Sequence, residues 1–480
     1  MSRSSGVLMH VSSLNGDYSI GSFGEDAKKF VDFLSDGGFT YWQVLPFCMV
    51  DETNSPYKSY SAFGANPYFI DLPTLRNKGL LTDEELDSAK QSSPYVCEYE
   101  RLAVERIELL KLAASRADED LREKVAEFIK EHSELCDASK FLALKAKNGG
   151  KPWYEWTDTE PSLKELFFWQ FVQYEFFVQW STVKDYANEK GIKIIGDIPI
   201  YVSHDSADVW ANRDQFLLNA DGHPTCVAGV PPDYFCEDGQ LWGNPLYDWK
   251  AMKKDGYSWW CNRMEYMLTL FDGVRIDHFR GLESYWSIPA NAKTAREGKW
   301  VKGPGISLVN KLKEVAGDKL IIAEDLGDIT PKVVALLNKS GLPGMRVLQF
   351  AFLGDRESPH LPHNYTKNCV AYTGTHDNNT MVGYIWETDN GTRSQLFDYC
   401  NCDPDNWNGA CEKIIKTVMA SCADTVIFPI QDILGFGADT RMNTPGTVGE
   451  NWQYRVTSDQ LNSVDRAKFR YFNMLYGRKL

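Results

Sequence analysis

The chain has 480 residues, of which 43% are hydrophobic and 24% are charged. This is the composition of an ordinary globular protein, and it excludes a disordered chain, a collagen-like fibre and a coiled coil. The 51 basic and 66 acidic residues give a net charge of −15, which disfavours binding to nucleic acid or to an anionic membrane surface.

Short apolar runs that end in polar residues recur along the chain. They cover residues 6–14, 41–46, 193–200, 271–278, 319–326, 345–350, 369–377 and 424–434. Several are continuously apolar, as in parallel strands that are covered on both faces. Helical patterns lie between them, for example at residues 26–36 and 330–339. Strand and helix alternating in this way predict an α/β fold, a (β/α)8 TIM barrel that forms one catalytic domain over residues 1–480.

Two long insertions interrupt the predicted barrel. The stretch 47–190 follows the second strand and is much too long for a simple loop. It is rich in Glu, Lys, Leu and Ala, so we expect a mostly helical inserted subdomain. Aromatic residues surround the helix expected at 166–180, which indicates a core helix too short to cross a bilayer. The stretch 201–270 follows the third strand, and its Trp, Tyr, Pro and Gly content predicts a loop-rich insertion.

Carboxylates end several of the predicted strands, accompanied by basic side chains. These residues are Asp197 in the third strand, Arg275, Asp277 and His278 in the fourth, Glu324 and Asp325 in the fifth, and His376 and Asp377 in the seventh. Barrel enzymes carry their catalytic groups at the C-terminal ends of strands. Each carboxylate taken alone could be a helix cap or a solvated loop acid. Together they favour general acid and nucleophile chemistry.

The combination points to glycosidic cleavage, in which one carboxyl group is protonated and the other ionised. A catalytic metal is the alternative. However, Asp277 and His278 are adjacent, as are His376 and Asp377, and adjacent strand residues point to opposite faces. We therefore expect no metal site. The sequence also lacks the glycine-rich phosphate loops and the Gly-x-Ser-x-Gly elbow of other enzyme classes.

Four segments resemble the ordered signature regions of the α-amylase clan. They are residues 197–201, 273–281 (GVRIDHFRG), 322–327 (IAEDLG) and 373–378 (TGTHDN). Further stretches resemble the 4-α-glucanotransferase family, also called amylomaltase or disproportionating enzyme. These are residues 6–13, 55–67, 229–235 with 239–245, and 441–445 with Asn451 and Trp452. Together the stretches run from end to end of the chain.

The resemblance implies a role for each strand-end residue. Asp277 would be the nucleophile that forms a covalent glucosyl-enzyme. Glu324 would be the general acid and then the base, and it is preferred to Asp325 only by its match to the family motif. Asp377 would hold ring hydroxyls of the glucose being cleaved. Asp197 and His376 are expected to contact the same glucose.

Arg275 and the second insertion complete the expected site. Residues two apart on a strand point the same way, so Arg275 is expected to keep Asp277 ionised. Transfer instead of hydrolysis requires that water be excluded, and a proline-stiffened aromatic loop suits that task. By resemblance, the glucan contacts there are Asp233, Tyr234, Phe235 and Trp242, with Tyr57 as a further contact. Loop packing is the alternative role for the two loop aromatics, Tyr234 and Phe235.

The expected activity is that of a 4-α-glucanotransferase, with α-1,4-glucans and malto-oligosaccharides as partners and no cofactor. It would cleave an α-1,4 bond with retention and pass the sugar to the 4-hydroxyl of an acceptor. The rivals are a glucan hydrolase of the same clan and a glucan-binding protein without activity. Scattered cysteines without CxxC spacing and an N-terminus without a secretory signal predict a cytoplasmic protein.

Overall fold

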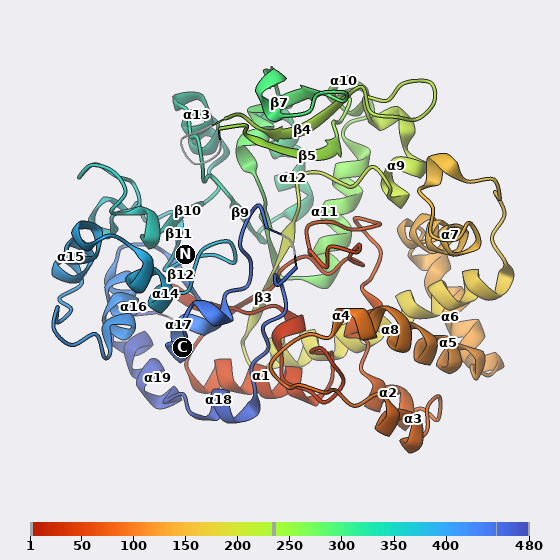
Figure 1. Cartoon of the computed structure of the whole chain (residues 1–480), viewed down its shortest axis with the longest axis horizontal. Coiled ribbons are helices and arrows are strands. Elements are labelled where there is room, and N and C mark those ends of the chain that lie inside the picture. The colour runs from red at the N-terminus through yellow and green to blue at the C-terminus, as the bar shows by residue number, and fades with distance from the viewer. Residues whose placement is uncertain (1–2, 233–236, 448, 479–480) are drawn as a thin grey trace.

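The computed structural model describes residues 3–232, 237–447 and 449–478. A closed barrel of parallel strands forms the core, in the order β1-β12-β11-β10-β9-β6-β3-β2 (Figure 1). The barrel strands are β1 (Ser4–Leu8), β2 (Tyr41–Gln43), β3 (Lys193–Ile198), β6 (Gly273–Ile276), β9 (Leu320–Ala323), β10 (Gly344–Val347), β11 (Cys369–Tyr372) and β12 (Thr425–Pro429). Each overlaps one predicted strand, so the predicted (β/α)8 barrel is confirmed.

Some barrel strands end earlier than the sequence pattern suggests. β1 ends at Leu8, and a 3-10 helix (Val11–Ser13) takes up the rest of its apolar run. β12 ends at Pro429, and helix α17 (Ile430–Leu434) follows directly. Both helical turns remain largely buried. Buried helical turns and buried strands use the same apolar residues, so the pattern cannot separate them.

Helices between and after the barrel strands cover the barrel. They are α1 (Glu25–Asp36), α11 (Ser258–Leu270), α12 (Ile306–Ala316), α13 (Pro331–Ser340), α14 (Met381–Glu387), α15 (Asn390–Tyr399), α16 (Ala410–Ala420), α17, α18 (Ser458–Asn462) and α19 (Arg466–Leu475). α13 shows why one of them starts and stops where it does. Pro331 sits at its first position, and Gly341 closes it at φ 70°.

Residues 47–190 are largely helical. They contain α2 (Leu72–Asn77), α3 (Asp83–Ser88), α4 (Tyr99–Arg101), a π-helical turn (Leu102–Arg106), α5 (Ile107–Ser115), α6 (Glu119–Glu131), α7 (Glu134–Lys147) and α8 (Leu163–Glu189). α8 packs against α1 and β3 and also against α5, α6 and α7, so apolar contacts surround it. No helix among the described residues is long and apolar enough to span a membrane. The division of the chain into a barrel and inserted subdomains stays a prediction.

A second, antiparallel sheet lies beside the barrel, at the top of Figure 1. Its order is β5-β4-β7-β8, with β4 (Cys226–Val230), β5 (Gln240–Pro245), β7 (Ser284–Pro289) and β8 (Lys299–Lys302). The stretch 201–270 is thus more regular than expected, since it also holds α9 (Ala207–Ala211), α10 (Trp249–Lys254) and α11. The sequence pattern misses this sheet because β4 pairs with β7, which follows barrel strand β6.

Candidate active site

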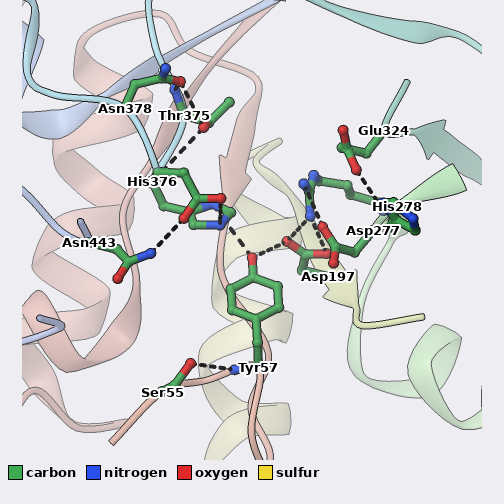
Figure 2. Close-up of polar contacts among 12 residues, drawn as sticks. Ser55, Tyr57, Asp197, Asp277, His278, Glu324, Thr375, His376, Asn378 and Asn443 are labelled. Atoms are coloured by element: carbon green, nitrogen blue, oxygen red, sulfur yellow. Dashed lines mark hydrogen bonds and ion pairs between the residues drawn. The ribbon is translucent and has the colours of Figure 1, made fainter. Parts of the chain in front are cut away.

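The C-terminal ends of the parallel barrel strands meet at one mouth of the barrel. β3 pairs with β6 in the register Asp197 to Arg275, and β6 pairs with β9 in the register Ile276 to Ala323. This register brings the ends of the third, fourth and fifth predicted strands side by side. Figure 2 shows the resulting group of side chains, with the residues from the end of β11 opposite those of β6.

Arg275 joins two carboxylates. Its Nη1 donates to both carboxylate oxygens of Asp197, at 2.8 and 2.7 Å, and its Nη2 lies 2.9 Å from Oδ1 of Asp277. Burial alone would lower the pKa of Arg275, but the two carboxylates outweigh burial and raise it well above its ordinary value. Asp197 is fully buried, whereas the Asp277 side chain is 28% exposed. Asp277 is therefore the member of the group that a ligand can reach.

Glu324 has different surroundings, although it follows the neighbouring strand. It is 8% exposed, and burial together with the charge of Asp277 raises its pKa to about 8, against the opposing effect of Arg275. Its oxygens accept hydrogen bonds from the backbone N–H groups of His278 (2.6 Å) and Leu326 (2.8 Å). A carboxyl group with this pKa carries a proton at neutral pH, as a general acid must.

His278 turns the chain sharply after Asp277. Its backbone is in the left-handed region at φ 48°, which is uncommon for a residue with a side chain. This conformation directs its N–H to the carboxyl group of Glu324. Burial lowers the pKa of the His278 imidazole to about 4, so the ring is neutral at physiological pH. His278 thus contributes its backbone to the site.

Asp325 points away from Glu324 and toward β10. Its Oδ1 accepts from the N–H of Met345 (2.6 Å) and its Oδ2 from Nη1 of Arg346 (3.0 Å). A Cβ at Gly344 would come within 2.7 Å of these oxygens, so a glycine is needed there. Asp325 is therefore hydrogen-bonded on the β10 side, away from Glu324, as the alternation of side chains along a strand leads one to expect.

Tyr57 bridges the two sides of the mouth, as Figure 2 shows. Its hydroxyl donates to Oδ2 of Asp197 at 2.8 Å and lies 3.5 Å from Nδ1 of His376. Its ring stacks on the imidazole of His376, with 5.0 Å between ring centroids. Nε2 of His376 lies 3.4 Å from Oδ2 of Asp377, whose side chain is 49% exposed. The structure therefore brings these sequence-predicted residues into one connected group.

Two residues near the C-terminus also hold Asp377. Nδ2 of Asn443 donates to Oδ1 of Asp377 at 2.7 Å, and Nη2 of Arg441 donates to its backbone oxygen at 2.6 Å. No role follows for either residue from the strand pattern, because both lie in a loop after β12. The only sequence signal is that they belong to the stretch 441–445, which carries the family resemblance.

The second insertion contributes one described residue to this region. Trp242 lies on β5, and its ring meets the imidazole of His278 edge to face, with 5.0 Å between centroids. The other three expected contacts of this insertion, Asp233, Tyr234 and Phe235, lie outside the described residues. Among the described residues, no group of three or more His, Cys, Asp or Glu side chains could hold a metal ion.

Comparison with known proteins places this arrangement in a family. The family model described as 4-alpha-glucanotransferase matches residues 9–461. A 4-alpha-glucanotransferase from Clostridium butyricum is 43% identical over 98% of this chain and 100% of its own length. One from Thermus thermophilus is 41% identical over 98% of this chain and 97% of its own length.

A solved structure agrees with these relatives. An amylomaltase from Streptococcus agalactiae in complex with acarbose is 37% identical to this chain, with a TM-score of 0.95 and complete coverage of both chains. Sequence and fold thus lead to the same family over the whole chain. The chain belongs to the 4-α-glucanotransferase family and is an enzyme that transfers glycosyl groups.

Proposed function

We propose that this enzyme cleaves an α-1,4 bond in a malto-oligosaccharide or starch-like glucan and transfers the glucanosyl unit, with retention, to the 4-hydroxyl of an acceptor glucan or glucose. The contrast between its two carboxyl groups carries the proposal. Asp277 is reachable and ion-paired with Arg275, whereas Glu324 is buried with a pKa of about 8. A retaining mechanism needs one ionised nucleophile and one protonated acid.

In the first step, a carboxylate oxygen of Asp277 attacks C1 of the donor sugar. Glu324 gives its proton to the departing glycosidic oxygen, so the C1–O bond breaks and a glucosyl ester of Asp277 forms. Arg275 orients Asp277 through their 2.9 Å contact. Asp377, held by Asn443, hydrogen-bonds ring hydroxyls of this glucose and strengthens those bonds in the transition state.

In the second step, Glu324 acts as a base. It takes the proton of the acceptor 4-hydroxyl while that oxygen attacks C1, and the bond between C1 and Asp277 breaks. Two inversions at C1 give net retention. Water competes with the acceptor, so the cleft must favour a sugar. Trp242, whose ring lies beside His278, suits stacking on an acceptor sugar. The contributions of Asp233, Tyr234 and Phe235 stay predictions.

The choice of glucan as substrate has support from a relative. The amylomaltase from Streptococcus agalactiae was solved in complex with acarbose, and we carry this ligand over to the present cleft. A cytoplasmic location and the absence of nucleic-acid and membrane partners remain predictions.

The decisive experiment incubates the purified enzyme with maltotriose and follows glucose and total reducing ends together. Glucose should rise while reducing ends stay constant and longer oligosaccharides appear, because transfer conserves reducing ends. Reducing ends that rise in step with cleavage would mean that water is the acceptor and the enzyme is a hydrolase. No change in either quantity would favour a glucan-binding protein without activity.

A further inference from the structure

A cavity of about 480 Å³ lies among the helices that follow barrel strands β11 and β12. Its walls come from α14, α17, the start of α16, and α19 with the segment that joins α18 to it. These elements are drawn in blue in Figure 1. None of the residues assigned to the catalytic mouth lines it. The volume falls within the range of small-molecule sites, roughly 300–1,000 Å³.

Two tryptophans form one wall of this cavity. Trp386 on α14 is 69% exposed, and its ring centroid lies 4.7 Å from that of Trp407 at an interplanar angle of 60°. Trp407 is held in place, since its Nε1 donates to the backbone oxygen of Pro404 at 2.9 Å and the guanidinium of Arg393 lies over its ring. Trp386 therefore presents a large apolar face to solvent beside a fixed second ring. Two adjoining aromatic rings of this kind can stack on an apolar face of a ligand.

Polar side chains also line the cavity. Nζ of Lys468 pairs with Oε2 of Glu412 at 2.5 Å, and both residues line the cavity. Asp465 accepts the backbone N–H of Lys468 at 3.0 Å and caps α19 beside them. The cavity thus offers both aromatic faces and hydrogen-bonding groups. A sugar has the matching surface, with an apolar face of C–H groups and an edge of hydroxyls.

We propose that this cavity is a second carbohydrate site, which binds a segment of an α-glucan chain outside the catalytic cleft. The choice of ligand rests on the proposed function. An apolar peptide is a poorer occupant, because it would remove water from Lys468, Glu412 and Asp465 without replacing their hydrogen bonds. An anionic ligand is disfavoured by the net charge of −15.

A second site has a consequence for long substrates. A glucan held at the Trp386 wall stays close to the enzyme between catalytic events, so its ends reach the cleft at a raised effective concentration. The benefit should grow with chain length, because only a chain that spans the separation between the two sites can occupy both at once. The enzyme should therefore bind polymeric glucan more tightly than the cleft alone allows.

The test uses the Asp277→Asn protein as the background, so that glucan is bound without turnover. Electrophoresis in native gels that contain amylopectin measures the apparent Kd from the retardation of the protein. Trp386→Ala should raise this Kd roughly three- to tenfold, the range expected for one aromatic stacking contact. Trp386→Phe should restore most of the binding, because it keeps an aromatic face. Tyr471→Ala is the matched control, since Tyr471 is an exposed ring on α19 that does not line the cavity.

Titration calorimetry with maltoheptaose gives an independent readout. We expect two sites in the Asp277→Asn protein, and in the Asp277→Asn, Trp386→Ala double variant we expect the Kd of the second site alone to rise roughly three- to tenfold. Three results would each overturn the proposal. They are equal gel retardation of the proteins with and without Trp386, an equal loss of amylopectin binding in Tyr471→Ala, and a single maltoheptaose site in both proteins. Failure of the proposed function is distinguishable, because it would appear in the wild-type maltotriose assay as rising reducing ends or as unchanged maltotriose.

Discussion

Glu324 and Asp277 follow neighbouring barrel strands but have opposite surroundings. Asp277 has its cation, Arg275, at 2.9 Å and is partly open to solvent, whereas Glu324 is buried and accepts hydrogen bonds from the backbone N–H groups of His278 and Leu326. Strand-end position is enough to nominate both residues from the sequence. It is not enough to divide their roles, because burial and the direction of a partner are properties of the folded site.

Replacing Asp277 by Asn should abolish transfer, with a loss of at least about 10³-fold in kcat on maltotriose, because the amide cannot form the covalent intermediate. Acarbose binding, measured by calorimetry, should remain. Asp325→Asn is the control, since Asp325 binds Met345 and Arg346 away from the mouth and should keep most of the activity. Near-normal rates in Glu324→Gln together with a large loss in Asp325→Asn would reverse the assignment of the acid.

The pH dependence should report Glu324. Its pKa is raised to about 8, so the acid is protonated below that pH and loses its proton above it. We expect kcat/KM for maltotriose to fall above about pH 8, approaching tenfold per pH unit. With α-maltosyl fluoride as donor, whose leaving group needs no proton, this fall should be much weaker. The same alkaline fall with both donors would assign it to another group.

At the scale of elements, the segment from β11 to α14 positions the residues opposite Asp277. Asp432 on α17 is buried and accepts the hydroxyl of Thr373 at 2.5 Å and the N–H of Met381 at 2.7 Å. These two residues bracket the turn that carries His376 and Asp377. Gln349 adds a third hydrogen bond to this segment, since its Nε2 donates to the backbone oxygen of Asn379 at 2.7 Å.

Asp432 would then act by positioning His376 and Asp377 and not by contact with the substrate. We therefore expect Asp432→Asn to weaken catalysis. The Asn amide has one acceptor oxygen, so its NH₂ group would face the N–H of Met381 or the hydroxyl of Thr373, and that hydroxyl would have to turn and accept instead of donate. We expect a loss of about 1–3 kcal/mol in the free energy of unfolding, measured by urea denaturation, and a lower kcat/KM on maltotriose. Asp439→Asn, at an exposed position in the next turn of chain, should change neither quantity. An unaltered kcat/KM in Asp432→Asn would contradict the positioning role.

At the scale of the whole molecule, the barrel closes between its first and last strands. β1 pairs with β12 from Ser4 with Thr425 to Leu8 with Pro429. Arg478 is buried at this seam. Its guanidinium donates to the backbone oxygens of Ser4 (2.9 Å), Ala423 (3.2 Å) and Met419 (2.7 Å).

Arg478→Met should destabilise this closure by leaving buried carbonyl groups without their donor. We expect a decrease of about 1–3 kcal/mol in the free energy of unfolding by urea denaturation. Arg470→Met is the matched control, because Arg470 also donates to backbone oxygens, those of Ser35 and Asp36, but at an exposed position. Equal effects of the two substitutions would show that burial at the seam does not matter.

The amino-acid sequence by itself determined where the barrel strands lie, which charged residues follow them and that α8 is apolar. These features depend on the pattern of apolar and polar residues within a short stretch of chain. Only the tertiary structure decided that residues 430–434 form a helix, that β4 pairs with β7, that Asn443 holds Asp377 and that burial raises the pKa of Glu324. Each of these depends on groups far apart in the chain, whose distances and shared burial are set only when the whole barrel closes.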